Sequence, residues 1–414
     1  MAKVAVMGYG VVGSGVCQVI KTHFESIIKK INEPIEIKYI LDRKDFPNSE
    51  FEQYFTRNFN DILNDDEVKI VAEVMGGVDP AFSYVKKLLL AGKSVVTSNK
   101  ELVAEKGAEL LDVARKNNVN FLFEASVGGG IPIIRPISQC LAANDVVEIA
   151  GILNGTTNFI LTKMIKEGMT LSDALELAQE LGYAERDPSA DINGEDACRK
   201  ICVLAALVYG KHVYPGWVYT EGIIKIDIED VKFAELWGGV IKLIGQVKKL
   251  ENGKIDISVE PMFIKSQSQL AGVDDVFNAI LVRGDSTGDI VFYGKGAGKL
   301  PTASAVVADI IDCVKHMKTR KYLYWEENKD ENYVEKRENT FSAFYIRMNH
   351  KDYIKAKEVV NEKIGNIRPI YNDIDKNNFA FTTDKISLGK VDELIIKLRN
   401  MGIEILSRVK IADF

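Results

Sequence analysis

The 414-residue sequence has few cysteines and few histidines. Its five cysteines, at positions 17, 140, 198, 202 and 313, are too scattered for a disulfide framework. Cys198 and Cys202 stand four residues apart among alanines and leucines, so we expect them to be core thiols. The four histidines cluster nowhere in the sequence. Neither a zinc site nor a histidine-based catalytic dyad is therefore supported.

Long hydrophobic runs and an excess of basic residues are also missing. No run approaches the roughly 18–20 apolar residues that a membrane helix needs, and the mean hydropathy is −0.04. The formal net charge of −6 argues against a general affinity for nucleic acid, although it leaves room for a local phosphate pocket. The chain opens on a strand-like run without a signal-peptide pattern. We expect a cytoplasmic, soluble protein of two to four domains, with no membrane or nucleic-acid partner.

The first 150 residues alternate between strand-like and helix-like stretches. Apolar runs predict strands, and spacing of three to four residues predicts helices. The predicted strands are 3–7, 35–41, 69–73, 94–97 and 120–124, and the predicted helices are 14–30, 80–91 and 104–117. Strands that alternate with helices indicate a parallel sheet covered on both faces.

The remaining chain has a different pattern, typical of an α+β region. Its predicted strands are 146–152, 255–264 and 289–293, and its predicted helices are 157–167, 171–181, 195–209 and 303–317. Residues 326–338 are highly charged and nearly devoid of aliphatics, which is typical of a linker. The last 75 residues or so then predict the order β, α, β, β, α, β, which is typical of a small ferredoxin-like unit. Its second element is a helix at 354–364.

A glycine-rich motif follows the first predicted strand. Residues 8–13 read Gly-Tyr-Gly-Val-Val-Gly and open the first predicted helix. In this pattern Gly8 permits the tight turn, Gly10 lets the backbone approach a pyrophosphate, and Gly13 lets helix and strand pack closely. The helix N-terminus adds free N–H groups. The motif predicts dinucleotide binding, and the alternative is a purely structural glycine turn.

The end of the second predicted strand is where the ribose of a dinucleotide is read. Leu41 is followed there by Asp42, Arg43 and Lys44. An acidic residue suits a free 2′-hydroxyl, whereas a neighbouring arginine suits a 2′-phosphate. NAD and NADP both stay open, and Arg43 and Lys44 favour NADP. The alternative is that both are ordinary surface cations.

Two further loops follow predicted strands of the parallel sheet. Residues 97–100 read Thr-Ser-Asn-Lys and lie at the carboxyl end of a strand, where open α/β sheets bind ligands. The alternative for Lys100 is a solvated loop lysine. Residues 124–131 combine Glu124 with three consecutive glycines, whose carbonyls could turn inward around a hard cation. The alternative for this segment is a flexible loop.

The segment 182–200 is the densest in polar side chains. Asp196 and Lys200 stand four residues apart and share one face of the predicted helix, whose later turns are apolar all round. The helix is therefore expected to be buried, with its first turn facing a cleft, where a lysine can relay a proton. Two alternatives remain. Asp196 could close a capping box begun by Asn193, or the pair could be a plain helical salt bridge.

Six segments carry a resemblance to a known family. They are GYGVVGSG, SNKELVA, EASVGGGIPIIRP, ILNGTTNFIL, LGYAERDPSADINGEDACRK and GKGAGKLPTASAVVADI. In their order and spacing, the chain resembles homoserine dehydrogenase over nearly its whole length. The resemblance implies an α/β chain of three domains: a Rossmann-type NAD(P)-binding domain at 1–135, completed by about 296–320; a substrate-binding and dimerisation α+β domain at 136–325; and a ferredoxin-like ACT regulatory domain at 340–414.

The resemblance also implies the activity and the site residues. The reaction is the NAD(P)-dependent interconversion of L-homoserine and L-aspartate 4-semialdehyde in threonine and methionine biosynthesis, by hydride transfer with a lysine as general acid/base. The catalytic residues it implies are Lys200 and Lys100, and the substrate ligands are Glu185 and Asp196. The cofactor ligands it implies are Tyr9, Gly10, Val11, Val12, Gly13, Arg43, Lys44, Thr97, Ser98, Lys100 and Gly298. Glu124 and the backbone carbonyls of Val127, Gly129 and Ile131 match the family's site for a monovalent cation, Na⁺.

The resemblance implies partners as well. The expected assembly is a homodimer or homotetramer, and an amino acid is the expected effector at the ACT-like domain. The start of that domain departs from the usual acidic-Pro-Gly loop, since residues 349–352 read Asn-His-Lys-Asp. This departure puts feedback by threonine in doubt, and a purely oligomerising role is the alternative.

Two other functions compete with a dehydrogenase of this kind. A semialdehyde dehydrogenase needs an exposed cysteine nucleophile, and Cys140 sits in an apolar stretch. A non-catalytic nucleotide sensor could share the fold, but the four polar residues Lys100, Glu185, Asp196 and Lys200 argue against it.

Overall fold

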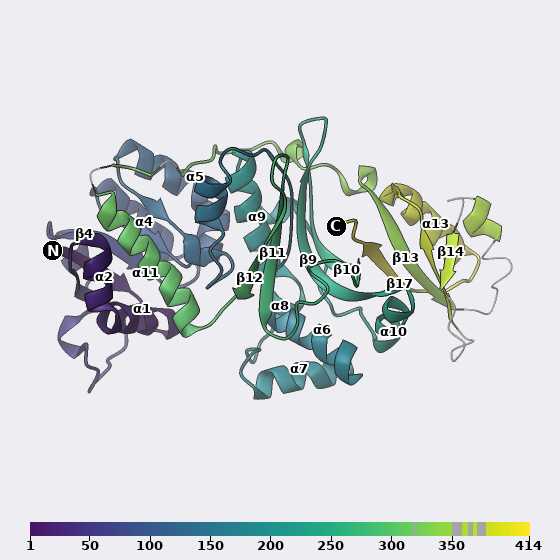
Figure 1. Ribbon diagram of the computed structural model, residues 1–414, viewed down its shortest axis with the longest axis horizontal. Coiled ribbons are helices and arrows are strands. Elements are labelled where there is room, and N and C mark those ends of the chain that lie inside the picture. The colour runs from purple at the N-terminus through teal and green to yellow at the C-terminus, as the bar shows by residue number, and fades with distance from the viewer. Residues whose placement is uncertain (318, 322, 350–357, 363–366, 371–377) are drawn as a thin grey trace.

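The computed structural model describes residues 1–414 except 318, 322, 350–357, 363–366 and 371–377. The described chain forms two β-sheets side by side along the long axis of the molecule, with helices packed against both (Figure 1). Among the described helices, none is both long enough and apolar enough to cross a membrane.

The first sheet is parallel throughout. Its strand order is β3-β2-β1-β4-β5-β6, and every neighbouring pair runs in the same direction. This confirms the parallel sheet that the alternating pattern predicts. Its strands are β1 (Ala2–Met7), β2 (Ile35–Leu41), β3 (Phe55–Thr56), β4 (Val68–Glu73), β5 (Ser94–Thr97) and β6 (Phe121–Leu122).

The helices between these strands lie near the predicted ones, with two differences, apart from α3, which the sequence patterns do not predict. They are α1 (Val11–Thr22), α2 (Phe24–Ile31), α3 (Phe59–Leu63), α4 (Ala81–Leu90) and α5 (Lys100–Lys116). The single helix predicted at 14–30 is wrong, because the chain breaks at His23 into α1 and α2. The loop at 97–100 is also shorter than predicted, since the Asn99 side chain caps α5 and Lys100 is its first residue.

A late helix returns to this first sheet. Helix α11 (Lys299–Lys315) packs along α1 (Figure 1). The approach is so close that a Cβ atom on Gly15 would lie 2.9 Å from the carbonyl oxygen of Lys299. Glycine at this position therefore permits the helix contact that brings residues 298–301 beside the glycine motif.

The second sheet has eleven strands in the described chain, and its main path is β12-β11-β7-β9-β10-β17-β13-β15-β14. Its first part is built from β7 (Val146–Ile152), β8 (Tyr219–Thr220), β9 (Gly239–Lys249), β10 (Ile255–Lys265), β11 (Phe277–Gly284) and β12 (Gly288–Lys295). The helices that accompany it are α6 (Gly155–Glu167), α7 (Leu171–Glu180), α8 (Ser189–Ile192), α9 (Glu195–Tyr209) and α10 (Ile228–Leu236). The sequence patterns above do not predict β8, β9, β11, α8 or α10.

The C-terminal strands continue the same sheet. They are β13 (Phe341–Asn349), β14 (Ile367–Ile370), β15 (Asn378–Thr383), β16 (Ile386–Ser387) and β17 (Ile405–Ile411), accompanied by α13 (Leu388–Asn400). Strands β17, β13, β15 and β14 are antiparallel neighbours in that order, and β17 also runs parallel to β10. Of the helix predicted at 354–364, residues 358–362 are helical, and the rest lies outside the described residues, as do 350–352.

The charged segment at 326–338 is not the free linker that its composition predicts. Val334 bridges to Ile255 of β10, and the Glu335 N–H group donates to the Ile255 carbonyl at 2.8 Å. The charged side chains find partners on the same strand: Arg337 pairs with Glu260 at 3.2 Å. We call residues 326–340 the strap, since they run across β10 on the way to β13.

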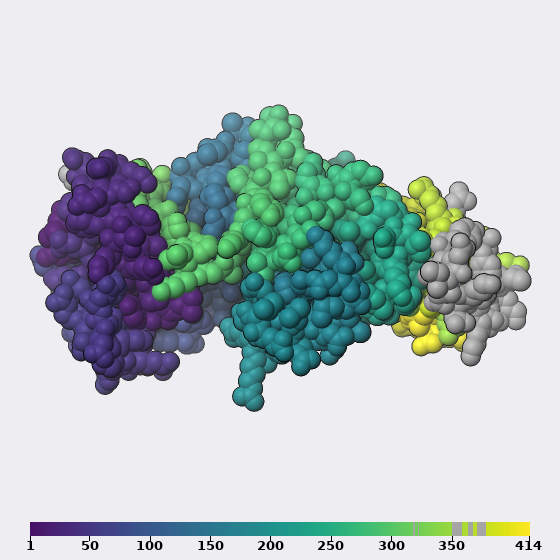
Figure 2. Space-filling model, turned by 60° about the horizontal axis from the view of Figure 1, so that its bottom comes forward, coloured from purple at the N-terminus to yellow at the C-terminus, as the bar shows by residue number. Residues whose placement is uncertain are grey.

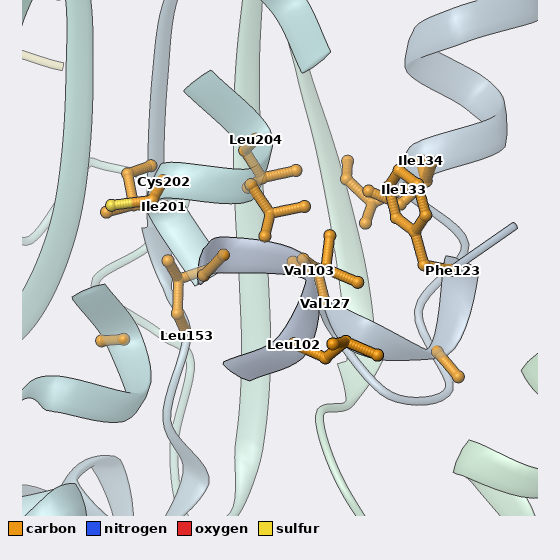
Figure 3. Packing of buried hydrophobic residues seen from close by; sticks show 14 of the residues in the cluster. Leu102, Val103, Phe123, Val127, Ile133, Ile134, Leu153, Ile201, Cys202 and Leu204 are labelled. Carbon is orange, nitrogen blue, oxygen red and sulfur yellow. The ribbon is translucent and has the colours of Figure 1, made fainter. Parts of the chain in front are cut away.

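A shared apolar core joins the two sheets around the start of α5 and the middle of α9. Leu102 and Val103 of α5 lie close to Val127, while Ile201 and Leu204 of α9 approach from the other side (Figure 3). All five side chains are almost completely buried. This packing fixes the first turn of α5 relative to the first turns of α9.

Candidate active site

One carboxylate joins the two lysines that the sequence singles out. The Asp196 Oδ2 atom lies 2.5 Å from Lys200 Nζ, and its Oδ1 atom lies 3.0 Å from Lys100 Nζ. Lys200 and Asp196 come from the first turns of α9, whereas Lys100 begins α5 beside the parallel sheet. The structure therefore brings Lys100, Lys200 and Asp196 together at the junction of the two sheets.

This cluster is buried on one side and open on the other. The Asp196 and Lys200 side chains are 8% and 10% exposed, whereas the Lys100 side chain is 41% exposed. Lys200 Nζ also donates to the Leu153 carbonyl at 2.7 Å. An ammonium group has three N–H donors, so the described partners of Lys200 leave one donor for another acceptor. Figure 2 shows a notch between the purple N-terminal part and the teal region that includes α6 and α7.

Two residues that the sequence reasoning missed complete the cluster. The Asn154 Nδ2 group donates to Asp196 at 2.9 Å and to Asp191 at 2.6 Å. Its Oδ1 atom accepts from the Thr157 N–H group at 2.8 Å, so Asn154 also caps α6. An asparagine directly before a helical segment is a capping signal that could have pointed to this residue.

The electrostatics follow from the mixture of burial and charge. Burial alone would raise the pKa of Asp196, but Lys200 and Lys100 hold that pKa well below its usual range. Asp196 in turn raises the pKa of Lys100, against the effect of burial. Burial and the nearby Asp196 charge raise the pKa of Asp191. The cluster thus keeps Asp196 ionised and Lys100 protonated.

These contacts decide between the alternatives for Asp196. The capping-box alternative is wrong, because the N-cap of α9 is Gly194 in a left-handed conformation, with no side-chain cap. The salt bridge between Asp196 and Lys200 does exist, but it also includes Lys100 from another element. The cluster is therefore more than a local helical pair.

The structure does not bring Glu185 into this cluster. Glu185 is exposed in the loop before α8, and its backbone carbonyl accepts from Gln179. Within the described residues its carboxylate has no hydrogen bond or ion pair. Its predicted contact with a substrate stays a prediction.

The glycine motif has the geometry that a dinucleotide site requires. Gly8 has a φ of +100°, and a Cβ atom on Gly13 would lie 1.9 Å from the Gly8 carbonyl oxygen. By contrast, a Cβ atom on Gly10 would have no neighbour within 4 Å, and the following Val11 is 67% exposed. The first and third glycines are required by packing, whereas the second faces open space at the N-terminus of α1.

Some side chains around the motif already contact other protein groups, and others are exposed. The Tyr9 ring packs edge-on against Phe46 and Phe55, and its N–H group donates to Asp42 at 2.8 Å. Asp42 also accepts from the Lys44 N–H group at 2.9 Å, so this carboxylate stabilises the loop backbone. The side chains of Arg43 and Lys44 are exposed, with no ion pair to the described residues.

The other predicted cofactor residues lie at the same edge of the sheet. Thr97 is fully buried, and its hydroxyl donates to Glu73 at 2.6 Å. Its side chain therefore points into the protein interior. Ser98 is half-buried at the end of β5. Gly298, with a φ of +119°, is the N-cap of α11 and is exposed. Glu73, whose pKa is raised by burial, is a further residue that the sequence reasoning missed.

The loop at 124–131 is packed rather than flexible. A Cβ atom on Gly129 would lie 2.4 Å from the Gly296 carbonyl oxygen, so the glycines allow two loops to pass in contact. The Glu124 carboxylate accepts three backbone N–H groups, from residues 133–135, at 2.6–2.9 Å. Its predicted role as a side-chain ligand for a cation therefore competes with its role at this helical turn.

The Glu124 loop is tied to α11 through a second carboxylate. Asp309 accepts from the Glu124 N–H group at 2.8 Å and forms an ion pair with Arg135. Burial raises the pKa of Asp309 to about 7, against the effect of Arg135. No group of three or more histidine, cysteine, aspartate or glutamate side chains among the described residues is arranged to hold a metal ion.

Comparisons with known proteins agree with this geometry. The family model "Homoserine dehydrogenase" matches residues 132–311, and "Homoserine dehydrogenase, NAD binding domain" matches residues 8–124. A homoserine dehydrogenase of Lactococcus lactis is 40% identical over 320 residues, which cover 76% of this chain and 74% of that protein. One of Neisseria gonorrhoeae is 42% identical, with coverage of 75% and 72%.

The chain belongs to the homoserine dehydrogenase family.

Two solved structures of homoserine dehydrogenases match this chain over its whole length, and a third matches three quarters of it. One from Thiobacillus denitrificans has a TM-score of 0.89 at 33% identity and covers 100% of this chain and 98% of its own. One from S. aureus has a TM-score of 0.83 at 36% identity, with coverage of 100% and 99%. A hyperthermophilic archaeal homoserine dehydrogenase in complex with NADPH matches 75% of this chain and 97% of its own at 30% identity, with a TM-score of 0.62.

Membership of the homoserine dehydrogenase family decides between the competing functions. The protein is an NAD(P)-dependent oxidoreductase that acts on a CH–OH group. Family membership therefore excludes the alternative of a semialdehyde dehydrogenase with a cysteine nucleophile. Cys140 is nevertheless exposed, whereas its apolar neighbours in the sequence suggest burial. Cys198 and Cys202 are buried, as predicted.

Proposed function

We propose that the protein interconverts L-homoserine and L-aspartate 4-semialdehyde, with Lys200 exchanging the hydroxyl proton of the substrate. The observation that carries this assignment is the buried cluster in which Asp196 joins Lys200 to Lys100. The donor that Lys200 has left is suited to a substrate oxygen. An assay of NAD⁺ and NADP⁺ reduction with L-homoserine tests the activity.

The chemistry needs a hydride carrier and a proton carrier. The nicotinamide, when bound, gives or takes the hydride. In the reductive direction, the Lys200 ammonium stabilises the forming alkoxide and then donates its proton to that oxygen. In the oxidative direction, Lys200 takes the proton from the hydroxyl. Lys100, kept protonated by Asp196, adds a second positive charge at the open side of the cluster.

Asp196 is proposed to hold the substrate. Glu185 is proposed as a second substrate ligand, with less support from its position. Asp196 is ionised, buried and adjacent to both lysines, which suits it to a hydroxyl or ammonium group of the substrate. Glu185 would have to approach from its exposed loop. The Glu185→Gln variant tests this, because a raised KM for L-homoserine would support a direct role.

The dinucleotide is proposed to bind along the backbone of residues 9–13, with Gly298 and the backbone of residues 97–98 nearby. The fit rests on the open space at Gly10 and on the exposed N-terminus of α1. The Asp42 carboxylate already accepts hydrogen bonds from two backbone N–H groups, so it is less suited to the 2′-hydroxyl of NAD. The exposed Arg43 and Lys44 side chains suit the 2′-phosphate of NADP.

Arg43 provides a direct test of this cofactor preference. We expect Arg43→Ala to weaken NADP⁺ binding by about tenfold or more, as for the loss of charged hydrogen bonds, and to leave NAD⁺ binding nearly unchanged. Arg368→Ala, at an exposed site far along the chain, is the matched control. Equal losses for both cofactors would show that Arg43 does not recognise the 2′-phosphate.

A monovalent cation, Na⁺, is proposed at the glycine loop. Backbone carbonyls of Val127, Gly129 and Ile131 are oxygen donors that suit a hard cation. Because the Glu124 carboxylate is already used, we propose that Glu124 contributes its backbone carbonyl instead. A dependence of activity on Na⁺ that survives in Glu124→Gln would support this assignment.

We further propose a division into an NAD(P)-binding domain at 1–135 with 296–320, a substrate and dimerisation domain at 136–325, and an ACT-like domain at 340–414. The packing of α11 on α1 supports the first, and the order β17-β13-β15-β14 supports a ferredoxin-like arrangement in the third. A homodimer or homotetramer and an amino-acid effector stay predictions from the resemblance. Sedimentation analysis tests the first of these.

A further inference from the structure

The side-chain amide of Asn154 uses every hydrogen-bonding position that it has. Asn154 lies between β7 and α6 and is 5% exposed. Its Nδ2 group donates to Asp191 at 2.6 Å and to Asp196 at 2.9 Å. Its Oδ1 atom accepts from the Thr157 N–H group at 2.8 Å and from the Thr157 hydroxyl at 3.0 Å. An amide has two N–H donors and one oxygen with two lone pairs, so these four contacts leave no position for a ligand.

The same contacts allow the Asn154 amide only one orientation. If the amide were turned over, its oxygen would face two carboxylates, and its N–H groups would face the Thr157 N–H group. The N-terminus of α6 therefore fixes the direction in which both donors of Asn154 point.

Helix α6 is itself held by a buried polar contact one turn further along. Asn158 is 1% exposed, and its Nδ2 atom lies 2.9–3.1 Å from three carbonyl oxygens, those of residues 273, 275 and 277. Lys242 of β9 donates to the Asn158 Oδ1 atom at 3.1 Å. Because these partners come from β9 and from the segment that leads into β11, α6 is anchored to the second sheet. The position of Asn154 is fixed with it.

The two carboxylates that share the Asn154 amide come from different helices. Asp191 belongs to α8 and Asp196 to α9, and each has an oxygen within 2.9 Å of the same nitrogen. Like charges held this close in a partly buried site repel each other. Burial and the charge of Asp196 raise the pKa of Asp191, and the hydrogen bond from Asn154 acts in the opposite direction. The amide thus offsets part of the repulsion between Asp191 and Asp196.

The residue before Asn154 holds the other member of the ion pair. The Leu153 carbonyl accepts from Lys200 Nζ at 2.7 Å. Asn154 donates to the Asp196 Oδ2 atom, which also lies 2.5 Å from Lys200 Nζ. Two consecutive residues at the end of β7 therefore contact both partners of this salt bridge, and the Asp196 Oδ1 atom is left for Lys100.

We propose that Asn154 is a positioning residue for the proton transfer assigned to Lys200. It turns the Asp196 carboxylate so that one oxygen faces Lys200 and the other faces Lys100, and it keeps the Asp191 charge from displacing Asp196. Asn154 acts through these carboxylates and does not contact the substrate. This inference rests on the proposed function of Lys200, and the alternative is that Asn154 only caps α6.

Substitution by serine separates the two roles. Serine caps a helix about as well as asparagine, so Asn154→Ser keeps the cap, but it has one O–H donor in place of two N–H donors. We expect kcat for L-homoserine oxidation to fall by about tenfold or more, as for a lost charge-assisted hydrogen bond. The KM for the cofactor and the melting temperature should change little. Asn154→Asp, which caps without any donor and adds a third carboxylate, should lower kcat further.

A matched control exists at Asn252, in the exposed turn between β9 and β10. Its amide donates to Glu335 at 3.0 Å, and its Oδ1 atom accepts from the Lys254 N–H group at 3.0 Å. This asparagine thus makes the same kinds of contact outside the lysine cluster. Asn252→Ser and Asn252→Asp should both keep the kcat and the KM values of the wild type.

A double-mutant cycle with Asp191→Asn tests the shielding of Asp196. This substitution removes the charge that Asn154 is proposed to hold back. The kcat loss caused by Asn154→Ser should therefore be smaller in the Asp191→Asn background than in the wild type. A purely capping role predicts the same loss in both backgrounds.

Three results would overturn the proposal. One is a kcat of Asn154→Ser within about twofold of the wild type, which corresponds to no lost hydrogen bond. Another is a loss confined to the affinity for the cofactor, and the third is an equal kcat loss in both backgrounds of the cycle. If Asn154→Ser fails to fold, Asn154→Thr decides in its place, since threonine also caps helices. A wild-type protein that oxidises L-homoserine with neither NAD⁺ nor NADP⁺ would instead contradict the proposed function, on which the inference rests.

Discussion

At the scale of single residues, the properties of Lys200 come from its two protein partners. The Leu153 carbonyl and the Asp196 carboxylate hold its ammonium group in a site that is almost closed to solvent. A flexible lysine side chain is thereby fixed in one position, which is the condition for efficient proton transfer.

We expect Lys200→Ala to lower kcat by roughly 10²–10⁴-fold, because the general acid/base is lost. NADPH binding, measured by fluorescence titration, should be retained, since Lys200 does not belong to the glycine motif. Lys166→Ala, which removes a 57% exposed lysine from α6, is the control and should keep full turnover. Near-normal turnover in Lys200→Ala would show that Lys200 is not the general acid/base.

The residue scale also shows what the sequence could and could not predict about the site. Asp196 and Lys200 were predictable as a pair, because helical spacing alone places them on one face. The Lys100 contact was not, since it depends on how α5 and α9 pack. Asn154 was missed because its side chain combines a cap with a contact to two carboxylates from another segment.

At the scale of elements, β1, the glycine motif and α1 form one unit with two kinds of glycine. Gly13 is packed against Gly8, whereas Gly10 faces open space. The same substitution at the two positions should therefore have different effects.

We expect Gly10→Ala to leave the melting temperature nearly unchanged and to weaken NADPH binding by about tenfold or more, because a methyl group would occupy space that the pyrophosphate needs. Gly13→Ala should lower both the melting temperature and the binding, since its Cβ atom would collide with the Gly8 carbonyl. Thermal unfolding and fluorescence titration measure the two effects. A stable Gly13→Ala variant with normal affinity would contradict this division.

Helix α11 supplies a pH-dependent contribution to stability through Asp309. Because burial raises the folded-state pKa of this acid to about 7, the folded protein binds a proton more tightly than the unfolded chain does. Asp309 therefore costs stability progressively as the pH rises from about 4, its value in an unfolded chain, to about 7.

We expect Asp309→Asn to gain roughly 1–4 kcal/mol relative to the wild type between pH 5 and pH 8, since it has no carboxylate to ionise. The midpoints of urea unfolding at several pH values measure this difference. Asp392→Asn, at a half-exposed carboxylate of α13, is the control. A difference that stays constant, or shifts the other way, would show that Arg135 already compensates the charge.

The elements differ in how well the sequence predicts them. Strand β7 and helix α9 match their predicted limits, because apolar residues make up most of β7 and follow one another through the later turns of α9. Strand β9 escaped prediction because two of its buried residues, Lys242 and Gln246, are polar and interrupt the apolar pattern. The break at His23 was missed because apolar spacing continues on both sides of it.

At the scale of the whole molecule, the C-terminal unit extends the second sheet, although it has a hydrophobic cluster of its own. Strand β17 pairs with β10 on one side and with β13 on the other. Composition alone suggested a separate unit after a linker, because pairing between distant strands leaves no local signal. The strap then adds further contacts across β10.

We expect deletion of residues 405–414 to lower the melting temperature and to cause aggregation, because the edge of β10 at Met262–Phe263 would lose its partner. Light scattering and thermal unfolding measure both effects. A control with Ile396→Ala, at a residue of α13 that is 59% exposed, should stay monodisperse and stable. A well-behaved deletion protein would mean that this strand edge is protected by other means.

The contact between Asp196 and Lys100 has a consequence for substrate entry. The Asp196 carboxylate is already paired with two ammonium groups that belong to the chain. If the ammonium group of a substrate binds Asp196, it replaces a lysine ammonium group that was bound there before. The exchange gains little net electrostatic attraction. Discrimination at this position then depends on which partner fits better, and higher ionic strength should loosen the internal partner as readily as the incoming one.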